Sequence, residues 1–132
     1  MKYRLSKGDI QMLTIYAKDP FSENYLSVEA GEEYELKVDP KEKWKDLFKW
    51  CDANGFWNIF LLDKYKRVPG HKCFKLCGTI GKNEECHFPI GIHRKWIAES
   101  SGDVFFFPND SNNLKRYDNN RKSIKLEVRR LE

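Results

Sequence analysis

The densest run of oxygen-bearing side chains lies between Asn109 and Ser123, where the sequence reads NDSNNLKRYDNNRKS. Eight of its first twelve residues are Asn, Asp or Ser. Carboxylate and amide oxygens of this kind are the ligands that a hard cation such as calcium prefers. The same residue types are common in surface turns, because their side chains bond local backbone groups and tolerate left-handed geometry. The segment therefore predicts either a cation site or an ordinary turn.

Cysteine and histidine form no comparable cluster. The four cysteines are Cys51, Cys73, Cys77 and Cys86. Cys73 and Cys77 lie in an alternating, strand-like run, which would separate them by about 13 Å and argues against a disulfide or a shared zinc ion. His87 and His93 would be about 20 Å apart in an extended chain, so they are no ligand pair. We expect buried free thiols, and a bridge from Cys51 to Cys77 or Cys86 stays open.

Aromatic side chains gather in one region of the sequence and suggest carbohydrate binding. Four of them lie close together and two more flank predicted loops: Trp44, Trp50, Phe56, Trp57, Tyr65 and Tyr117. An aromatic ring offers an apolar platform to the C–H face of a sugar, while amides and hydroxyls bind the sugar's hydroxyl groups. Large aromatic residues also fill hydrophobic cores, and that role is the alternative for Trp44 and Trp57.

Two basic stretches, KEKWKDLFKW at 41–50 and LKRYDNNRK at 114–122, are interleaved with aromatic residues. The formal net charge is only +4, from 24 basic and 20 acidic side chains. That excess is well below the electrostatic footprint of a nucleic-acid-binding protein. We expect no nucleic-acid partner, and the basic, aromatic 41–50 segment leaves a protein or another polyanion as an alternative partner.

Catalytic motifs are missing from the sequence. Asp46 and Asp52 are the two carboxylates that could pair, but their spacing carries no acid–base signature. The sequence has no nucleophile elbow, phosphate-binding loop or zinc motif. We therefore predict a protein that is not an enzyme.

The elements that position these residues follow a period of two. In EYELKV, residues 33–38, and in SIKLEVR, residues 123–129, apolar and charged side chains alternate strictly. Turn signals such as DANG and ESSGD separate the extended runs. The other runs predicted as strands are 10–17, 25–30, 56–62, 72–80, 87–92 and 103–108. About eight short strands predict an all-β fold, a jelly-roll β-sandwich.

One segment has the pattern of a short helix instead. In DPKEKWKDLFKWC, residues 39–51, Asp39 occupies an N-cap position and Pro40 the first helical position. Trp44, Leu47, Phe48 and Cys51 would then share one helical face. We predict a short helix near residues 40–51.

Length and composition predict a single domain over residues 1–132. Hydrophobic residues make up 40% of the chain, which excludes a disordered chain. No apolar run approaches the ~20 residues that cross a bilayer, so we expect no membrane partner. The start, MKYRLSKGDIQ, lacks the features of a secretory signal. We expect a protein that is cytoplasmic, or secreted without a visible signal peptide.

Three stretches together resemble the LecA-like (PA-IL-like) bacterial galactophilic lectins. They are LSVEAGEEYELKV followed by KWKD, then KCFKLCGTIGKNEECHFPIG, and finally SGDVFFFPNDSNNLKRYDNNRKSIKLEV. They correspond in order to the family's turn before a tryptophan-ended strand, its "IG" strand, and its closing "ND…Y.dN" loop. The resemblance spans roughly residues 25 to 129. It implies a jelly-roll, galactose-binding-like β-sandwich that binds carbohydrate with calcium and has no catalytic activity.

The resemblance also implies a ligand set for calcium. The family's aspartate corresponds to Asp110 and its paired asparagines to Asn119 and Asn120. A backbone carbonyl before the tyrosine falls at Arg116, and another after the tryptophan falls near Leu47. The bound sugar completes the coordination of the ion through its hydroxyls.

For the sugar, the resemblance and the aromatic residues predict contacts from Asp110 and Asn119, with Trp44 and Tyr117 as ring platforms. The family holds galactose with a histidine before a proline, where this chain has Val68, so His71 is the nearest substitute. We predict a lectin-like domain whose sugar is unspecified and which could form oligomers. The alternative is a non-catalytic β-sandwich that binds a protein or polyanion through its basic and aromatic surface.

Overall fold

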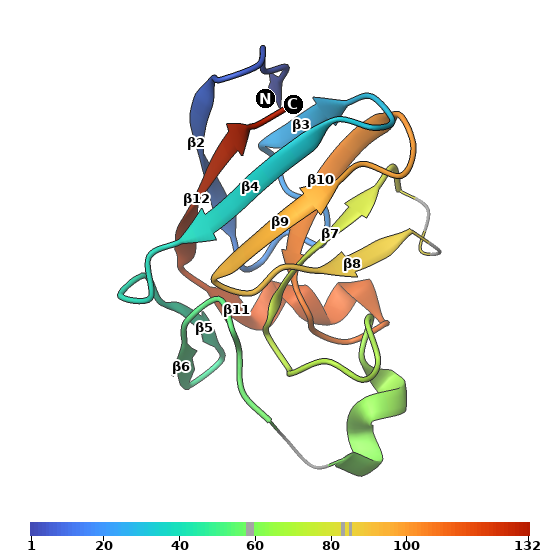
Figure 1. Ribbon diagram of the computed structural model, residues 1–132. Coiled ribbons are helices and arrows are strands. Elements are labelled where there is room, and N and C mark those ends of the chain that lie inside the picture. Colours follow the sequence, from blue (N-terminus) through green and yellow to red (C-terminus); the bar gives the residue numbers. More distant parts are fainter. Residues whose placement is uncertain (58–59, 83, 85) are drawn as a thin grey trace.

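The computed structural model describes residues 1–57, 60–82, 84 and 86–132, and its strands form two large sheets that face each other (Figure 1). The five-stranded sheet has the order β1-β3-β10-β7-β8. Its strands are β1 (Lys2–Tyr3), β3 (Tyr25–Val28), β10 (Gly102–Pro108), β7 (Leu76–Ile80) and β8 (His87–Pro89). All of its pairs are antiparallel except β1 with β3.

The second large sheet has four antiparallel strands in the order β2-β12-β4-β9. They are β2 (Ile10–Tyr16), β12 (Ser123–Arg130), β4 (Glu33–Val38) and β9 (His93–Ile97). In β12, Ile124, Leu126 and Val128 are fully buried while Lys125 is exposed, as a strict alternation requires. The predicted all-β sandwich is thereby confirmed.

The core lies between these two sheets. Leu13 and Leu36 of the four-stranded sheet and Leu26 and Phe106 of the five-stranded sheet belong to one buried cluster. At one edge, the Phe88 ring on β8 stacks on Trp96 of β9 with ring centroids 4.4 Å apart. Burial of these side chains on both sheets is what stabilises the sandwich.

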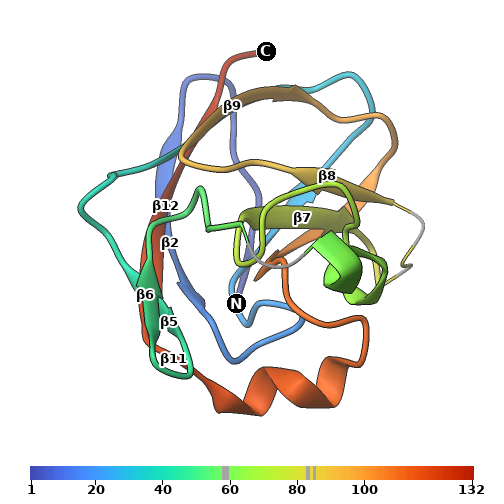
Figure 2. The ribbon, with the colours of Figure 1, turned by 90° about the horizontal axis from the view of Figure 1, so that it is seen from below.

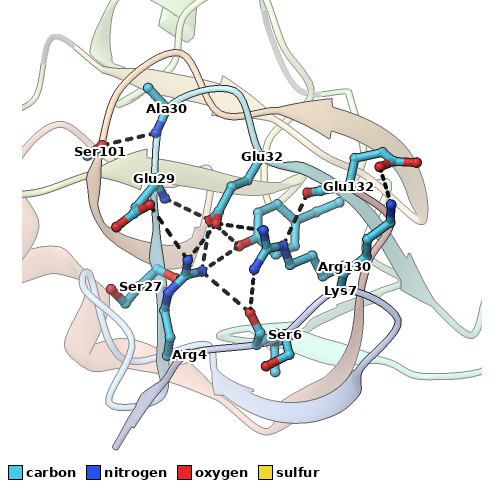
Figure 3. A network of polar contacts seen from close by, with 12 residues as sticks. Arg4, Ser6, Lys7, Ser27, Glu29, Ala30, Glu32, Ser101, Arg130 and Glu132 are labelled. Carbon is cyan, nitrogen blue, oxygen red and sulfur yellow. Dashed lines mark hydrogen bonds and ion pairs between the residues drawn. The ribbon is translucent and has the colours of Figure 1, made fainter.

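A carboxylate network ties the ends of the chain together at one end of the sandwich (Figure 3). Both Glu32 carboxylate oxygens accept from the Arg4 guanidinium, at 2.8 and 2.5 Å. Arg130 Nη2 lies 3.0 Å from Glu32 Oε2, and the Tyr34 hydroxyl donates to Oε1 at 2.8 Å. Hydrogen bonds from Arg4 lead the causes that lower the pKa of Glu32 to about 2. The network therefore stabilises the fold away from the loops described next.

The opposite end of the sandwich carries a small third sheet and two 3₁₀ helices (Figures 1 and 2). The sheet has the order β11-β5-β6 and consists of β11 (Asn120–Arg121), β5 (Trp44–Asp46) and β6 (Lys49–Cys51). The helices are η1 (Phe60–Tyr65) and η2 (Leu114–Asn119). Figure 2 looks onto this end, where η2 and β11 run directly into β12.

The predicted helix over 40–51 is wrong, because this segment forms the β5–β6 hairpin. Trp44 pairs with Cys51 across the hairpin, and both side chains point into the core. Leu47 adopts a left-handed conformation, with φ of 53°, at the turn. The cap-like DP signal precedes a loop, because burial of Trp44 and pairing with β11 outweigh local helix propensity.

Other predicted boundaries differ from the structure in smaller ways. Residues 60–62 of the predicted strand 56–62 belong to η1, and residues 58–59 lie outside the described part. Strand β9 was not predicted, and β7 begins only at Leu76 because Phe74 has a positive φ. All four cysteines are free, with Cys86 exposed and the other three buried. No helix among the described residues is long and apolar enough to span a membrane.

Candidate functional site

The site begins where strand β10 ends, at Asn109 and Asp110. Asn109 is fully buried, and its amide bridges the neighbouring loop by accepting from Val68 N at 2.9 Å and donating to Val68 O at 2.9 Å. The same amide donates to the Lys72 carbonyl at 3.1 Å. Asp110 follows directly, and its own carbonyl accepts from Arg67 N at 2.8 Å. Asn109 thus holds Asp110 and the 68–72 loop in one fixed arrangement.

Of the two predicted asparagines, the structure places Asn120 beside Asp110. Asn120 is 0% exposed, and its Nδ2 donates to Asp110 Oδ2 at 2.9 Å and to the Ala17 carbonyl at 3.0 Å. Its Oδ1 is buried and has no hydrogen-bond partner among the described residues. A buried amide oxygen without a partner costs about 1–3 kcal/mol. It is therefore a strong candidate for an ion ligand.

A second carboxylate, Asp46, completes this cluster. It pairs with Asn120 in the register of β5 and β11, and the charge of Asp110 acts on it. Burial, and then the Asp110 charge, raise the pKa of Asp46 to about 6. Burial also raises the pKa of Asp110, although the hydrogen bond from Asn120 and the Arg116 charge oppose this rise. Two desolvated carboxylates, of which Asp110 opposes the ionisation of Asp46, are an arrangement that a cation would relieve.

Sequence reasoning missed the role of Asp46, because it compared this residue with Asp52 and not with Asp110. Asp52 caps a local turn instead, by accepting from Asn54 N at 2.8 Å. No signal in the sequence joins Asp46 to Asp110, since their proximity depends on the pairing of β5 with β11. The tryptophan-ended strand that carries the resemblance was the one feature close to Asp46.

The residues of this cluster fit a cation that prefers oxygen ligands. Asp46 and Asp110 offer carboxylate oxygens and Asn120 offers Oδ1, which are the donor types that calcium takes. Within the described residues, no group of three or more His, Cys, Asp or Glu side chains could hold a metal ion. A site here would therefore need amide and backbone oxygens in addition to its two carboxylates.

The remaining predicted ion ligands lie on η2 or at the hairpin turn. Asn119 is the last residue of η2 and is exposed, and Arg116 is exposed one turn earlier. Leu47 sits at the tip between β5 and β6 and is exposed. Coordination by Asn119, and by the carbonyls of Arg116 and Leu47, stays a prediction.

The two predicted ring platforms lie in the core, which corrects that prediction. Trp44 is 0% exposed and packs edge-on against Phe74, with ring centroids 5.6 Å apart. Tyr117 is 1% exposed, and its hydroxyl donates to the Pro108 carbonyl at 2.7 Å. The same hydroxyl accepts from Asp110 N at 3.4 Å. These residues support the Asp110 loop from within and present no ring face to a ligand.

An open pocket of about 460 Å³ adjoins Asp110. Its wall includes Tyr65 and Leu62 from η1, the Lys66 side chain, and Arg116. A second pocket, of about 300 Å³, contains His71 together with Trp57. Lys66 lies between the two pockets, because its ammonium donates to the His71 carbonyl at 3.0 Å while it also lines the first pocket. The structure thus brings His71 next to the Asp110 pocket but not into it.

Comparison with solved structures shows which known fold this chain shares. The chain has the fold of a solved structure described as "EclA N-terminal domain; PllA-like lectin", with a TM-score of 0.64 and 18% sequence identity. The match covers 90% of this chain and 94% of that one. No protein-family model matches the sequence, and no curated protein matches it. The chain is therefore a β-sandwich with the same fold as this lectin domain, and membership of the LecA-like family stays a prediction.

Proposed function

We propose that this protein is a non-catalytic carbohydrate-binding domain whose sugar site is assembled around a calcium ion. The ion ligands are the carboxylates of Asp46 and Asp110 and the Oδ1 atom of Asn120. The observation that carries the proposal is the buried Asn120 Oδ1, which lacks a partner within the described structure while its own Nδ2 holds Asp110. The likeness to a lectin domain supports the same conclusion at the level of the fold.

The electrostatics of the apo site explain why a cation would bind. Desolvation, and then the charge of Asp110, raise the pKa of Asp46 to about 6, so Asp46 is ionised at neutral pH at a cost to the folded state. A bound calcium ion supplies positive charge to these groups and open coordination positions to sugar hydroxyls. Three protein side chains leave room in a shell of about six to eight oxygens. Asn119 and the carbonyls of Arg116 and Leu47 are the remaining candidates of the predicted set.

The sugar itself would lie in the pocket beside Asp110. Tyr65 is exposed on one wall of this pocket, and Asn112 and Asn113 line it as well. An exposed ring can pack against the C–H face of a saccharide, while nearby amides bind its hydroxyl groups. In this proposal Tyr65 takes the platform role that the sequence had assigned to Trp44 and Tyr117.

Calcium titration with a glycan array tests the proposal. Millimolar calcium should raise the melting temperature of the wild type, and EDTA should reverse the rise. Asp110→Asn should abolish the shift, whereas Asp118→Asn should retain it, because Asp118 is an exposed carboxylate on the same loop. Glycan binding should require calcium in the same way. The proposal fails if calcium leaves melting and glycan binding of the intact wild type unchanged.

A second function is favoured by the tip of the β5–β6 hairpin. Phe48 is 84% exposed there, Leu47 and Trp50 are exposed beside it, and the Lys45 ammonium lies 5.0 Å from the Trp50 ring centroid. Such a basic and aromatic tip suits a protein or polyanion partner. Lys43→Glu combined with Lys45→Glu should then abolish capture of that partner while glycan arrays show no binding. Calcium-dependent glycan binding that survives both changes would reject this alternative.

A further inference from the structure

The pocket that contains His71 has the composition of an anion-binding site. Its lining residues are Asn54, Trp57, Gly70, His71, Lys72 and Lys75, and they enclose about 300 Å³. Two of them are lysines and none is acidic. Lys72 and Lys75 are both half-buried, and neither has a carboxylate within 4.0 Å among the described residues. Two half-buried lysines without a carboxylate partner among the described residues favour an anionic ligand.

Asp63, an acidic group that contacts the pocket residue Gly70, already has its own partners. Its carboxylate accepts from Gly70 N at 2.9 and 3.0 Å and lies 3.3 Å from the ammonium of Lys66. Lys66 and Asp63 therefore compensate each other and leave the charges of Lys72 and Lys75 unbalanced. The environment of His71 agrees with this arrangement, because burial and then the charge of Lys75 lower the pKa of its ring.

A tryptophan ring in this pocket distinguishes a saccharide from a bare anion. Trp57 is 66% exposed, and the ammonium groups of Lys66 and Lys72 lie 5.5 and 5.9 Å from its ring centroid. A sugar ring packed on the exposed indole would bring a charged substituent within reach of these ammonium groups. An exposed tryptophan next to Lys72, which has no carboxylate partner among the described residues, thus matches a sugar that carries an acidic group.

We propose that this pocket is a subsite for an acidic saccharide, in which Lys72 and Lys75 bind a carboxylate or sulfate group and Trp57 packs against the ring. This inference rests on the proposed function, since Lys66 joins the pocket to the one beside Asp110 and a single oligosaccharide could extend into both. Two lysines in a small pocket match one acidic group. A nucleic acid needs a basic track with repeated charges, and this pocket offers only two lysines.

The test compares neutral, uronic-acid-containing and sulfated oligosaccharides by calorimetry in calcium buffer, with a single-stranded oligonucleotide as a further arm. The acidic oligosaccharides should bind at least about tenfold more tightly than the neutral one, and added salt should reduce this difference in affinity. Lys72→Gln combined with Lys75→Gln should remove that preference. Lys95→Gln combined with Lys125→Gln should keep it, because these two exposed lysines lie on the four-stranded sheet.

The outcomes separate this inference from the proposed function. A calcium-dependent melting shift in the Lys72 and Lys75 double variant shows that it is folded and retains the ion site. If it does not fold, Lys72→Gln alone replaces it, and this variant should also weaken acidic binding. Equal affinity for neutral and acidic sugars, or an unchanged double variant, overturns the acidic subsite and leaves the lectin proposal intact. Oligonucleotide binding as tight as acidic sugar binding overturns it in favour of a general polyanion surface. Absence of all sugar binding overturns both.

Discussion

Asp46→Asn should stabilise the protein in the absence of calcium while weakening its response to calcium. The folded state holds the Asp46 carboxyl with a pKa of about 6, compared with 3.8 for the unperturbed group. Each pH unit between these values is worth about 1.4 kcal/mol, so ionised Asp46 costs the folded state about 3 kcal/mol at pH 7.5. Because the side chain keeps some contact with water, we expect about 2–3 kcal/mol of the cost to be recovered by the neutral amide.

The sign of this effect gives it a pH signature. A carboxyl whose pKa is raised by folding binds its proton more tightly in the folded state, so the apo protein loses stability as the pH rises from about 4 to about 6. Asp46→Asn should therefore be more stable than the wild type at pH 7.5. The two proteins should differ little below pH 4, where Asp46 is protonated in both states.

Chemical and thermal denaturation with EDTA at several pH values measures this difference. A gain of 2–3 kcal/mol corresponds to roughly 6–12 °C in melting temperature for a chain of this size. Calcium should then raise the melting temperature of the wild type more than that of the variant. Asp118→Asn is the matched control, since this exposed carboxylate should change stability by less than about 0.5 kcal/mol.

Two results would refute the reasoning. If Asp46→Asn is no more stable than the wild type at pH 7.5 in EDTA, burial and the charge of Asp110 do not disfavour the ionised Asp46 carboxylate as described. If the gain in stability persists below pH 4, it arises from packing or hydrogen bonding of the new amide and not from removal of a charge.

Three further predictions concern the stability of the fold, the support of the site and the exposure of the thiols. Glu32→Gln should destabilise the protein by about 3 kcal/mol at pH 7. Because the pKa of Glu32 falls from 4.5 to about 2 on folding, this loss should shrink as the pH falls from 4.5 towards 2 in urea titrations. Asn109→Ala should lower the free energy of unfolding by about 2–4 kcal/mol and weaken calcium binding, because it leaves several backbone groups of the 68–72 loop without partners. A variant that binds calcium as tightly as the wild type would contradict the positioning role of Asn109. Under native conditions a thiol reagent should modify only Cys86, and all four cysteines should react in denaturant, as mass spectrometry would show.

The candidate site could be predicted from the sequence only in part. The Asn, Asp and Ser run and the resemblance around it led to Asp110 and Asn120, and the structure joins these two by a hydrogen bond. The sequence could not distinguish Asn120 from Asn119, because the last turn of η2 decides which of two adjacent amides faces inward. It also could not reveal Asp46, because a carboxylate far away in the chain reaches Asp110 only through β-pairing.

The long strands of the sandwich follow from the sequence by itself. A period of two over six to eight residues, as in β4 and β12, is typical of a strand with one buried face. Strands β5, β6 and β11 have only two or three residues, which is too short for any period to appear. Tertiary packing decided these elements: it buried Trp44 in the core, left Phe48 and Trp57 exposed, and set Asp46 against Asp110. Over two or three residues, local propensity contributes less free energy than the burial of one large side chain. The strands that build the site were therefore determined by the packing of the whole fold.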